Sequence, residues 1–276
     1  MKRYFIRGFV GLIVCVFLLA CETVPITGRR TLNLVPQSQL NSMAKSQYDQ
    51  FLEQNQLSDN TAASQMVKRV GLRLQRSVEG YYAARGMQDL LSGYSWEFNL
   101  IESDEKNAWC MPGGKVVVYE GILSIAEDEE GLAVVMGHEI AHAIAEHGNE
   151  RMSTALIAQL GGAALSTAIE EQPESTKKWF LAAYGAGTQV GVLLPYSRRQ
   201  EAEADHLGLI FMARAGYDPR AAIPFWKRMA KEGGGGATPE FLSTHPTSQS
   251  RVENIEEIMP TALKHYRQAV GQAGTQ

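Results

Sequence analysis

The residues Gly137-His138-Glu139-Ile140-Ala141-His142 form a His-Glu-x-x-His pattern inside an apolar, alanine-rich stretch. If the stretch from Leu132 to Glu150 is helical, His138 and His142 lie one turn apart on the same face. Two neutral imidazoles placed in this way can bind a single Zn²⁺, and Glu139 beside them can take a proton from a water molecule. The alternative is a chance match on an amphipathic helix, expected in roughly one chain of this length in a hundred or fewer. The motif therefore predicts a zinc site.

A zinc site that catalyses needs a third protein ligand and one open position. The best candidate ligand is Glu201, in the sequence Glu201-Ala202-Glu203-Ala204-Asp205. Glu201 and Asp205 lie one helical turn apart and share a face, whereas Glu203 points elsewhere. Glu201 would bind the zinc, and Asp205 would accept a hydrogen bond from the Nδ1–H of a ligand histidine. The alternative is an ordinary acidic helix face in contact with solvent.

The other histidines narrow the choice of ligands. On a continuous helix His147 lies about 180° from His138 and faces away from the metal. His206 and His265 have polar neighbours, which is typical of solvated surface residues. His245 therefore remains as a further candidate for the site.

The first twenty residues predict a targeting segment. Basic residues at three of the first seven positions precede an apolar stretch of 13 residues, Gly8 to Ala20. This stretch is too short to span a bilayer comfortably and fits the core of a signal peptide. It ends on Leu18-Leu19-Ala20-Cys21, which resembles the bacterial lipobox, so we expect cleavage before Cys21 and attachment of lipid to it. A secretory signal or a short anchor is the alternative.

Charge and cysteine content limit the partners and the compartment. Without the first twenty residues the chain holds 23 basic and 30 acidic side chains, a net charge of −7, and no basic patch indicates a nucleic-acid partner. Cys15 leaves with the signal and Cys21 is acylated, so Cys110 alone remains and no intramolecular disulfide can form. Glu22 is not the aspartate that retains lipoproteins in the inner membrane. We therefore expect an outer-membrane lipoprotein that faces the periplasm.

Periodicity and turn residues predict a mainly helical α+β fold. The expected division is a signal peptide at 1–20, a tether at 21–36, a folded domain at 37–268 and a flexible tail at 269–276. The expected strands are 94–101 and 115–119, with a turn at 112–114. The expected helices are 38–53, 61–75, 122–126, 132–150, 151–169, 179–194, 198–215, 219–231 and 248–266, with a hinge at 170–178.

Together the motifs resemble the HtpX and CAAX prenyl endopeptidase family of zinc metallopeptidases. The shared residues are His138-Glu139-x-x-His142, Glu201 and Asp205 within Tyr196 to Gly208, Asn107-Ala108 with Pro112-Gly113-Gly114, and Ser243-Thr244-His245-Pro246 followed by Arg251. The resemblance covers most of the chain from Gln37 to Tyr266. A lipobox in place of HtpX-type membrane spans suggests that the bacterial outer-membrane lipoprotein members are nearest. The chain departs from the family at Trp109-Cys110, where aliphatic residues or Phe are usual. We also expect none of the C-terminal helical repeats that some members carry.

The resemblance implies a gluzincin-like fold, with helices around a small sheet and one zinc ion held between His138, His142 and Glu201. It also implies that an edge strand of the sheet pairs with an extended substrate. Here the residues of that strand are Asn107, Ala108, Trp109, Cys110 and Met111.

The implied chemistry is hydrolysis of a peptide bond. Glu139 takes a proton from water and passes it to the leaving amine, and a hydrogen-bond donor stabilises the oxyanion. His245 is our candidate for that donor. In relatives a histidine at this position can instead occupy the fourth zinc position and hold the enzyme inactive. As a turn residue before Pro246, His245 would have neither role.

We therefore expect a lipid-anchored zinc metalloendopeptidase that hydrolyses misfolded or unassembled cell-envelope proteins and is held at the membrane through Cys21. The alternative is an envelope chaperone or assembly factor with a mostly latent protease site. Glu139 favours the enzyme, because a protein that only binds has no use for a general base. A structural zinc domain is a third possibility, which the open coordination position disfavours.

Overall fold

The computed structural model describes residues 21–24, 27–160, 174–184, 196–233, 239–245 and 250–273 of the 276 residues. The expected signal peptide lies outside the described residues. So do 161–169 and 185–194 of the expected helices, and the glycines at 234–236.

The sheet has three strands in the order β3-β5-β4. β5 (Lys115–Tyr119) pairs in parallel with β3 (Glu97–Ile101) and antiparallel with β4 (Ala108–Met111). A turn joins β4 to β5 at 112–114, where Gly113 and Gly114 have φ angles of 76° and 80° that glycine adopts at little cost. β4 is thus the edge strand that the sequence predicted, although all four of its residues are buried.

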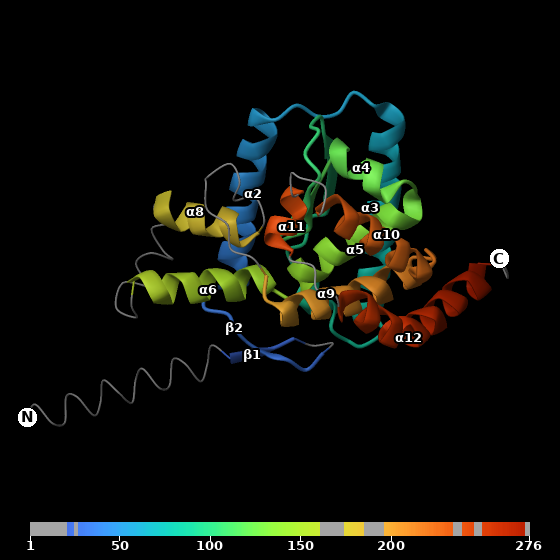
Figure 1. Cartoon of the computed structure of the whole chain (residues 1–276). Coiled ribbons are helices and arrows are strands. Elements are labelled where there is room, and N and C mark those ends of the chain that lie inside the picture. Colours follow the sequence, from blue (N-terminus) through green and yellow to red (C-terminus); the bar gives the residue numbers. More distant parts are fainter. Residues whose placement is uncertain are drawn as a thin grey trace, which may run out of the picture.

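Helices surround this sheet, and the mainly helical α+β fold is confirmed (Figure 1). None of the described helices is both long and apolar enough to cross a membrane. The helices are α2 (Gln37–Gln54), α3 (Thr61–Ala83), α4 (Glu120–Ala126), α5 (Glu129–Ile144), α6 (His147–Leu160), α8 (Glu174–Ala183), α9 (Arg198–Arg214), α10 (Ala222–Gly233), α11 (Glu240–Thr244) and α12 (Ser250–Ala273), with 3₁₀ turns η1 (Gln88–Leu91) and η3 (Pro219–Ala221).

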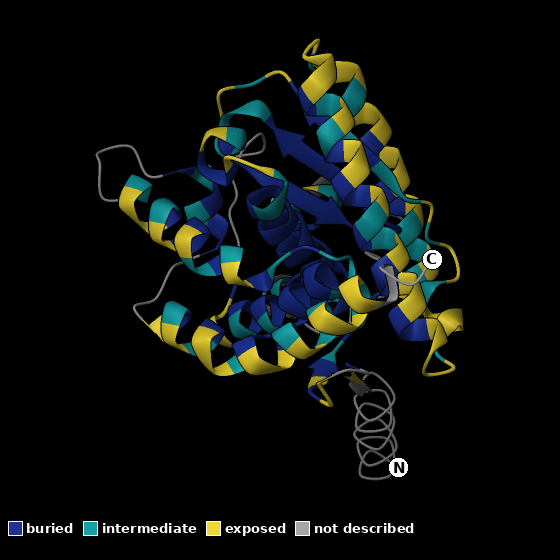
Figure 2. Cartoon of the chain, turned by 90° about the vertical axis from the view of Figure 1, so that its right-hand side faces the viewer, coloured by how far each residue is buried: buried dark blue, intermediate teal, exposed yellow. Residues whose placement is uncertain are grey.

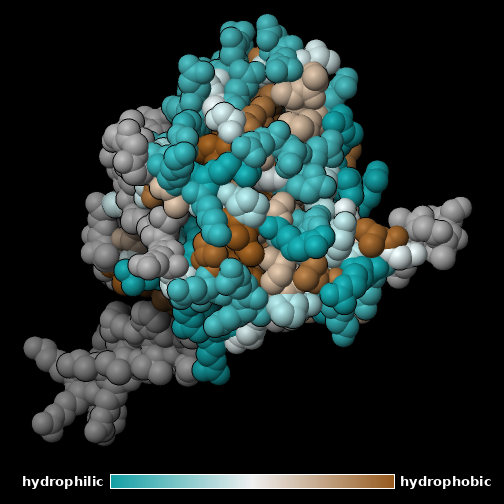
Figure 3. Space-filling view, turned by 45° about the vertical axis from the view of Figure 1, so that its right-hand side comes forward, coloured by the Kyte–Doolittle hydropathy of each residue, from teal (hydrophilic) through white to brown (hydrophobic). Residues whose placement is uncertain are grey.

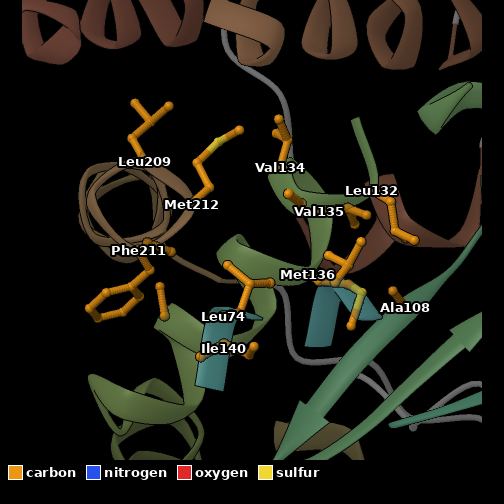
Figure 4. Packing of buried hydrophobic residues seen from close by; sticks show 14 of the residues in the cluster. Leu74, Ala108, Leu132, Val134, Val135, Met136, Ile140, Leu209, Phe211 and Met212 are labelled. Carbon is orange, nitrogen blue, oxygen red and sulfur yellow. The ribbon is translucent and has the colours of Figure 1, made fainter. Parts of the chain in front are cut away.

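Helix α5 is the centre of the fold, and every residue from Gly131 to Ile144 is buried (Figure 2). Its start is fixed by Asp128, whose side chain accepts a hydrogen bond from the Gly131 amide at 2.8 Å. The helix is apolar on almost all sides because α3, α9 and β4 pack around it. Figure 4 shows this packing, with Met136 of α5 near Ala108 of β4.

Helices α5 and α9 approach each other closely at two glycines. A Cβ atom added to Gly208 would lie 3.0 Å from the carbonyl carbon of Gly137, and one added to Gly137 would lie 3.2 Å from the Gly208 oxygen. Both contacts are with backbone, which cannot move aside as a side chain can. The two glycines therefore set the distance between the two helices that carry the predicted zinc ligands.

The structure corrects the predicted helix 132–150. Helix α5 ends at Ile144, Glu146 has a left-handed φ of 55°, and a separate helix α6 begins at His147. Asn33 and Asn149 donate hydrogen bonds to the Glu146 carboxylate at 2.8 and 3.3 Å. This break turns the chain, so His147 does not face away from the metal as a continuous helix would require.

Other boundaries also differ from the prediction. Helix α3 extends eight residues beyond the predicted 61–75, to Ala83. Part of the predicted hinge 170–178 is helical, because α8 begins at Glu174. The last helix continues to Ala273, into the segment expected as a flexible tail.

The segment expected as a tether is folded where the structure describes it. β1 (Cys21–Thr23) and β2 (Arg30–Leu32) form an antiparallel pair beside α6 (Figure 1). The Leu34 amide donates to the Ser153 hydroxyl at 2.9 Å, and the Asn149 side chain donates to the Val35 carbonyl at 2.9 Å. Residues 27–35 are therefore part of the folded domain.

The surface drawn in Figure 3 is mainly hydrophilic, with apolar side chains in small separate groups. The large hydrophobic residues exposed by more than 40% are Leu57, Leu72, Leu90 and Val270. They belong to different parts of the described chain, as is ordinary for a globular surface.

Candidate metal centre

Four side chains from three helical segments converge at one buried point. His138 and His142 come from α5, Glu201 comes from the first turn of α9, and His245 lies at the C-terminal end of α11. One ligand atom from each residue lies within 4.8 Å of all the others. None of the four is more than 4% exposed. The structure therefore brings together the three predicted ligands and the remaining candidate histidine.

The spacing of the donor atoms fits a tetrahedral zinc ion. His138 Nε2 lies 3.0 Å from His142 Nε2 and 3.3 Å from His245 Nδ1. Glu201 Oε1 lies 3.3 Å from His142 Nε2 and 3.0 Å from His245 Nδ1. Tetrahedral zinc with bonds of about 2.0–2.1 Å places its donor atoms roughly 3.3–3.4 Å apart. These four separations are close to that value, and all four donor atoms lie within 4.8 Å of one another, so the side chains could close around one zinc ion.

The hydrogen bonds behind the ligands fix which nitrogens face the centre. His138 Nδ1 lies 2.9 Å from Asp205 Oδ1, so this nitrogen carries the proton and donates it to the carboxylate. The Nε2 lone pair of His138 then points at the corresponding lone pair of His142. Two acceptor atoms 3.0 Å apart repel each other unless a metal ion or a shared proton lies between them. The arrangement therefore suits a metal ion, and Asp205 has the position that the sequence predicted for it.

Arg251 joins both acids of this centre. Its guanidinium lies 3.0 Å from Glu201 Oε2 and donates a hydrogen bond to Asp205 Oδ1 at 2.8 Å. The same guanidinium stacks 3.3 Å from the ring centroid of Trp226, which packs edge-on against His138. Sequence reasoning named Arg251 only as part of a resemblance. In the structure, the positive charge of Arg251 offsets the negative charges of the two buried carboxylates.

His147 and Glu203 are functional-site residues that sequence reasoning missed. His147 Nδ1 lies 2.8 Å from His142 Nδ1, and His147 Nε2 lies 2.9 Å from Glu203 Oε2. His147 is completely buried and Glu203 is 7% exposed. Glu203 does point away from the metal, as predicted, but it points at His147 and not at solvent. The only sequence signal for these two residues was that a histidine and an acid lie close to the two motifs.

The pKa values of the ligand side chains reflect burial and mutual charge. Burial lowers the pKa of His142 well below its usual value and that of His245 to about 4, so both are neutral imidazoles. Burial also acts on His138, but its bonds to Asp205 and Glu201 outweigh it and raise that pKa to about 9. A cation bound there must displace the His138 proton. For Glu201, burial is outweighed by His245, Arg251 and the ligand histidines, and the pKa falls well below its usual value.

Glu139 lies beside this cluster and is 2% exposed. Burial raises its pKa to about 8, so once deprotonated this carboxylate is a stronger base than an ordinary glutamate. Its Oε1 has no hydrogen-bond partner and lies 3.5 Å from His245 Nε2. A buried carboxylate oxygen without a hydrogen bond is costly, and this geometry is the one expected of a general base waiting for substrate.

The predicted substrate strand lies next to the metal helix. β4 packs on α5, and burial together with the nearby Glu139 charge raises the pKa of the Cys110 thiol well above its usual value. Trp109 is fully buried against Phe51 and Tyr48 and donates to the Tyr119 hydroxyl at 3.3 Å, which accounts for its choice over an aliphatic residue. Pairing of β4 with a substrate remains a prediction.

Comparison with known proteins places this centre in a family. The family model of peptidase family M48 matches residues 69–259, which contain the metal cluster and Glu139. The chain belongs to peptidase family M48. With its single buried His/His/Glu/His cluster among the described residues, it is a zinc metalloendopeptidase of that family.

Named relatives within M48 come from mitochondria and from bacteria. The chain is 37% identical to the mitochondrial metalloendopeptidase OMA1 of Schizosaccharomyces pombe over 246 residues, 87% of this chain and 67% of that protein. It is 31% identical to human OMA1 over 92% of this chain and 49% of that protein. The β-barrel assembly-enhancing protease of Escherichia coli is 29% identical over 57% of this chain and 33% of that protein.

Two consequences follow from these comparisons. The OMA1 proteins are more similar to the chain than the bacterial protease is, in identity and in aligned length, whereas the sequence motifs suggested the bacterial outer-membrane lipoprotein members as nearest. The chain also spans only part of these relatives: 67% of the Schizosaccharomyces pombe protein, 49% of human OMA1 and 33% of the Escherichia coli protease.

Proposed function

We propose that this M48 peptidase is anchored by lipid at Cys21 to the outer membrane and cleaves misfolded or unassembled envelope proteins on the periplasmic side. The sequence Leu18-Leu19-Ala20-Cys21 after a short apolar stretch supports the anchor. A relative named for β-barrel assembly supports a role among envelope proteins. The observation that carries the peptidase chemistry is the buried Glu139 Oε1 atom, which has no hydrogen-bond partner, beside the His/His/Glu/His donor set.

The residues divide the work of hydrolysis as follows. His138, His142 and Glu201 would hold the zinc, which would supply a Lewis acid for the peptide carbonyl and for water. Glu139, with its raised pKa, takes the proton from the attacking water and delivers it to the leaving amine. Asp205 holds the orientation of His138 through the bond to Nδ1.

The position of His245 beside the other three donors supports a role as a gate. Its Nδ1 is the fourth donor atom of the cluster, and its ring stacks on Phe241 with centroids 4.3 Å apart. If His245 bound the zinc together with the other three residues, it would take the position that water or substrate needs. We propose that the resting enzyme is closed in this way and that substrate binding requires His245 to leave. The donor role would require the same movement, followed by a hydrogen bond to the oxyanion.

A structural zinc site would also have four protein ligands. Glu139 argues against that function, because a structural site has no use for a buried carboxylate beside the metal. A chaperone with a latent site is the second candidate, and the complete burial of the cluster is the observation that favours it.

The test compares strains that carry wild-type protein, Glu139→Gln or the control Glu130→Gln, which changes an acid in the first turn of the same helix. Glu139→Gln removes only the base, so we expect zinc and fold to be kept and casein hydrolysis to fall by about 10²–10⁴-fold or more. Unassembled envelope proteins should accumulate with Glu139→Gln and not with Glu130→Gln. Near-normal casein hydrolysis by Glu139→Gln would rule out the peptidase mechanism. Loss of hydrolysis without accumulation of envelope proteins would favour the chaperone.

A further inference from the structure

A chain of hydrogen bonds starts on the side of His142 that faces away from the metal centre. His142 Nε2 points at the other ligands, which leaves Nδ1 free to contact His147 Nδ1 at 2.8 Å. His147 Nε2 contacts Glu203 Oε2 at 2.9 Å. The Glu203 carboxylate then accepts hydrogen bonds from the Thr27 hydroxyl on Oε1 and from Arg29 Nε–H on Oε2.

The Glu203 carboxylate, at the end farthest from the metal centre, sets the direction of these hydrogen bonds. An ionised carboxylate only accepts, so His147 Nε2 must donate to Glu203. Neutral His147 then has its lone pair on Nδ1, which accepts the proton of His142 Nδ1. That in turn leaves His142 Nε2 as the bare nitrogen that faces the metal site. Every donor in the chain is therefore oriented consistently with metal binding by His142.

The N-terminal segment closes the far end of this chain. Arg29 is 8% exposed, and besides Glu203 it binds the Glu150 carboxylate through Nη1 at 3.0 and 2.8 Å. Arg29 and Glu203 thus form a buried ion pair in which each partner also has other hydrogen bonds. Removing one partner of such a pair leaves an uncompensated charge in a site shielded from water. Glu203 would then turn toward solvent and withdraw its acceptor from His147.

We propose that Arg29 and Thr27 are positioning residues for the zinc ligand His142, acting through Glu203 and His147. The N-terminal segment is then part of the support of the metal centre, although it contributes no metal ligand. The inference rests on the proposed zinc site, and it is independent of the substrate and of the lipid anchor.

The test measures how fast the full-length zinc-loaded protein releases its metal to a chromogenic chelator. Loss of a residue that orients a metal ligand typically costs about 10–100-fold in metal affinity or activity. Glu203 and His147 lie between Arg29 and the ligand His142. We therefore expect Arg29→Ala to speed zinc release by about 10-fold, at the low end of that range. The matched control is Arg30→Ala, which removes the same charge from the neighbouring, exposed position and should leave release unchanged.

A second measurement separates positioning from simple destabilisation. A double-mutant cycle compares wild type, Arg29→Ala, Glu203→Gln and the variant that carries both changes. If Arg29 acts through Glu203, the double variant releases zinc no faster than Glu203→Gln alone. The visible spectrum of the cobalt-loaded protein should change in Arg29→Ala and not in Arg30→Ala, because it reports the ligand arrangement directly.

Defined results would overturn the proposal. Unchanged zinc release in Arg29→Ala, equal acceleration in Arg30→Ala, or additive effects in the cycle would each reject it. If Arg29→Ala does not fold, Thr27→Val replaces it, since it removes only the hydroxyl donor, and a rate equal to wild type would then be the rejecting outcome. Glu201→Ala is the reference for the zinc site itself. Retention of zinc by that variant would refute the site, whereas the outcome with Arg29 concerns only its support.

Discussion

At the scale of single residues, the metal centre combines two demands that oppose each other. Four protein donors give tight binding, but hydrolysis needs one corner for water and substrate. His138, His142 and Glu201 are held from behind or along their helices by buried partners. His245 differs in its backbone: it follows the five-residue helix α11 and does not lie within a long helix, although its ring stacks on Phe241. It is therefore the donor that can leave at least cost.

This argument predicts the effect of His245→Ala. If His245 is the gate, the variant should hydrolyse casein faster than wild type and cleave itself, because the fourth corner is open. The measurement is the turnover of one unfolded substrate at matched zinc occupancy, with His265→Ala, which changes a partly exposed histidine of α12, as the control. If turnover falls instead, by an amount equivalent to roughly 2–4 kcal/mol in the barrier, His245 is the oxyanion donor. Unchanged turnover would leave it the role of a turn residue.

At the scale of elements, the sequence predicted what local spacing determines. The two histidines, Glu139 and the Glu201–Asp205 pair each lie within one helix, where a separation of four residues fixes the relative direction of side chains. Strand β5 and the turn at Gly113 and Gly114 were predicted for the same local reason.

The break between α5 and α6 could not be predicted in this way. Its left-handed residue is Glu146, not glycine or asparagine, so no local preference marks it. The hydrogen bond from Asn33, more than a hundred residues earlier in the chain, helps to hold it. The positions of His147 and Glu203 depend on this tertiary contact, which is why spacing along one helix misplaced them.

The crossing of α5 and α9 gives a prediction at this scale. Gly208→Ala adds a methyl group 3.0 Å from the Gly137 backbone, so the two helices must separate by a few tenths of an ångström. We expect the free energy of unfolding to fall by about 1–3 kcal/mol and zinc to bind more weakly, because the ligands lie on both helices. The measurements are chemical denaturation and metal competition.

A matched control for this change is Gly80→Ala. Gly80 lies on an exposed face of helix α3, and an added Cβ meets nothing within 4 Å. The substitution should therefore stabilise the helix by roughly 0.5–1 kcal/mol. If Gly208→Ala also stabilised the protein and left zinc binding unchanged, the close approach of the helices would not be what sets the ligand distances.

At the scale of the whole molecule, the N-terminal segment takes part in two proposals. One is the lipid anchor at Cys21, and the other is the support of the metal centre by Thr27 and Arg29. The contacts of this segment with Glu203, Glu150 and Ser153 tie residues 27–35 to the domain. The sequence predicted a free tether here because polar residues with proline and glycine are typical of linkers. The buried ion pair of Arg29 needs partners that lie more than a hundred residues away in the chain, and no composition reveals such partners.

The segment begins at Cys21, where we propose that lipid is attached, and this gives the last prediction. Cys21→Ala removes the thiol that would carry the lipid, so the protein should leave the outer-membrane fraction or remain uncleaved, held by its signal. Fractionation with an antibody against the chain, together with the mass of its N-terminal peptide, distinguishes these results. Cys110→Ala is the control, because its buried thiol lies in β4 and takes no part in anchoring. A processed Cys21→Ala protein that still sediments with outer membranes would show that another feature anchors it. Zinc content and casein hydrolysis should be unchanged in the released protein, because the contacts of Thr27 and Arg29 with Glu203 do not involve Cys21.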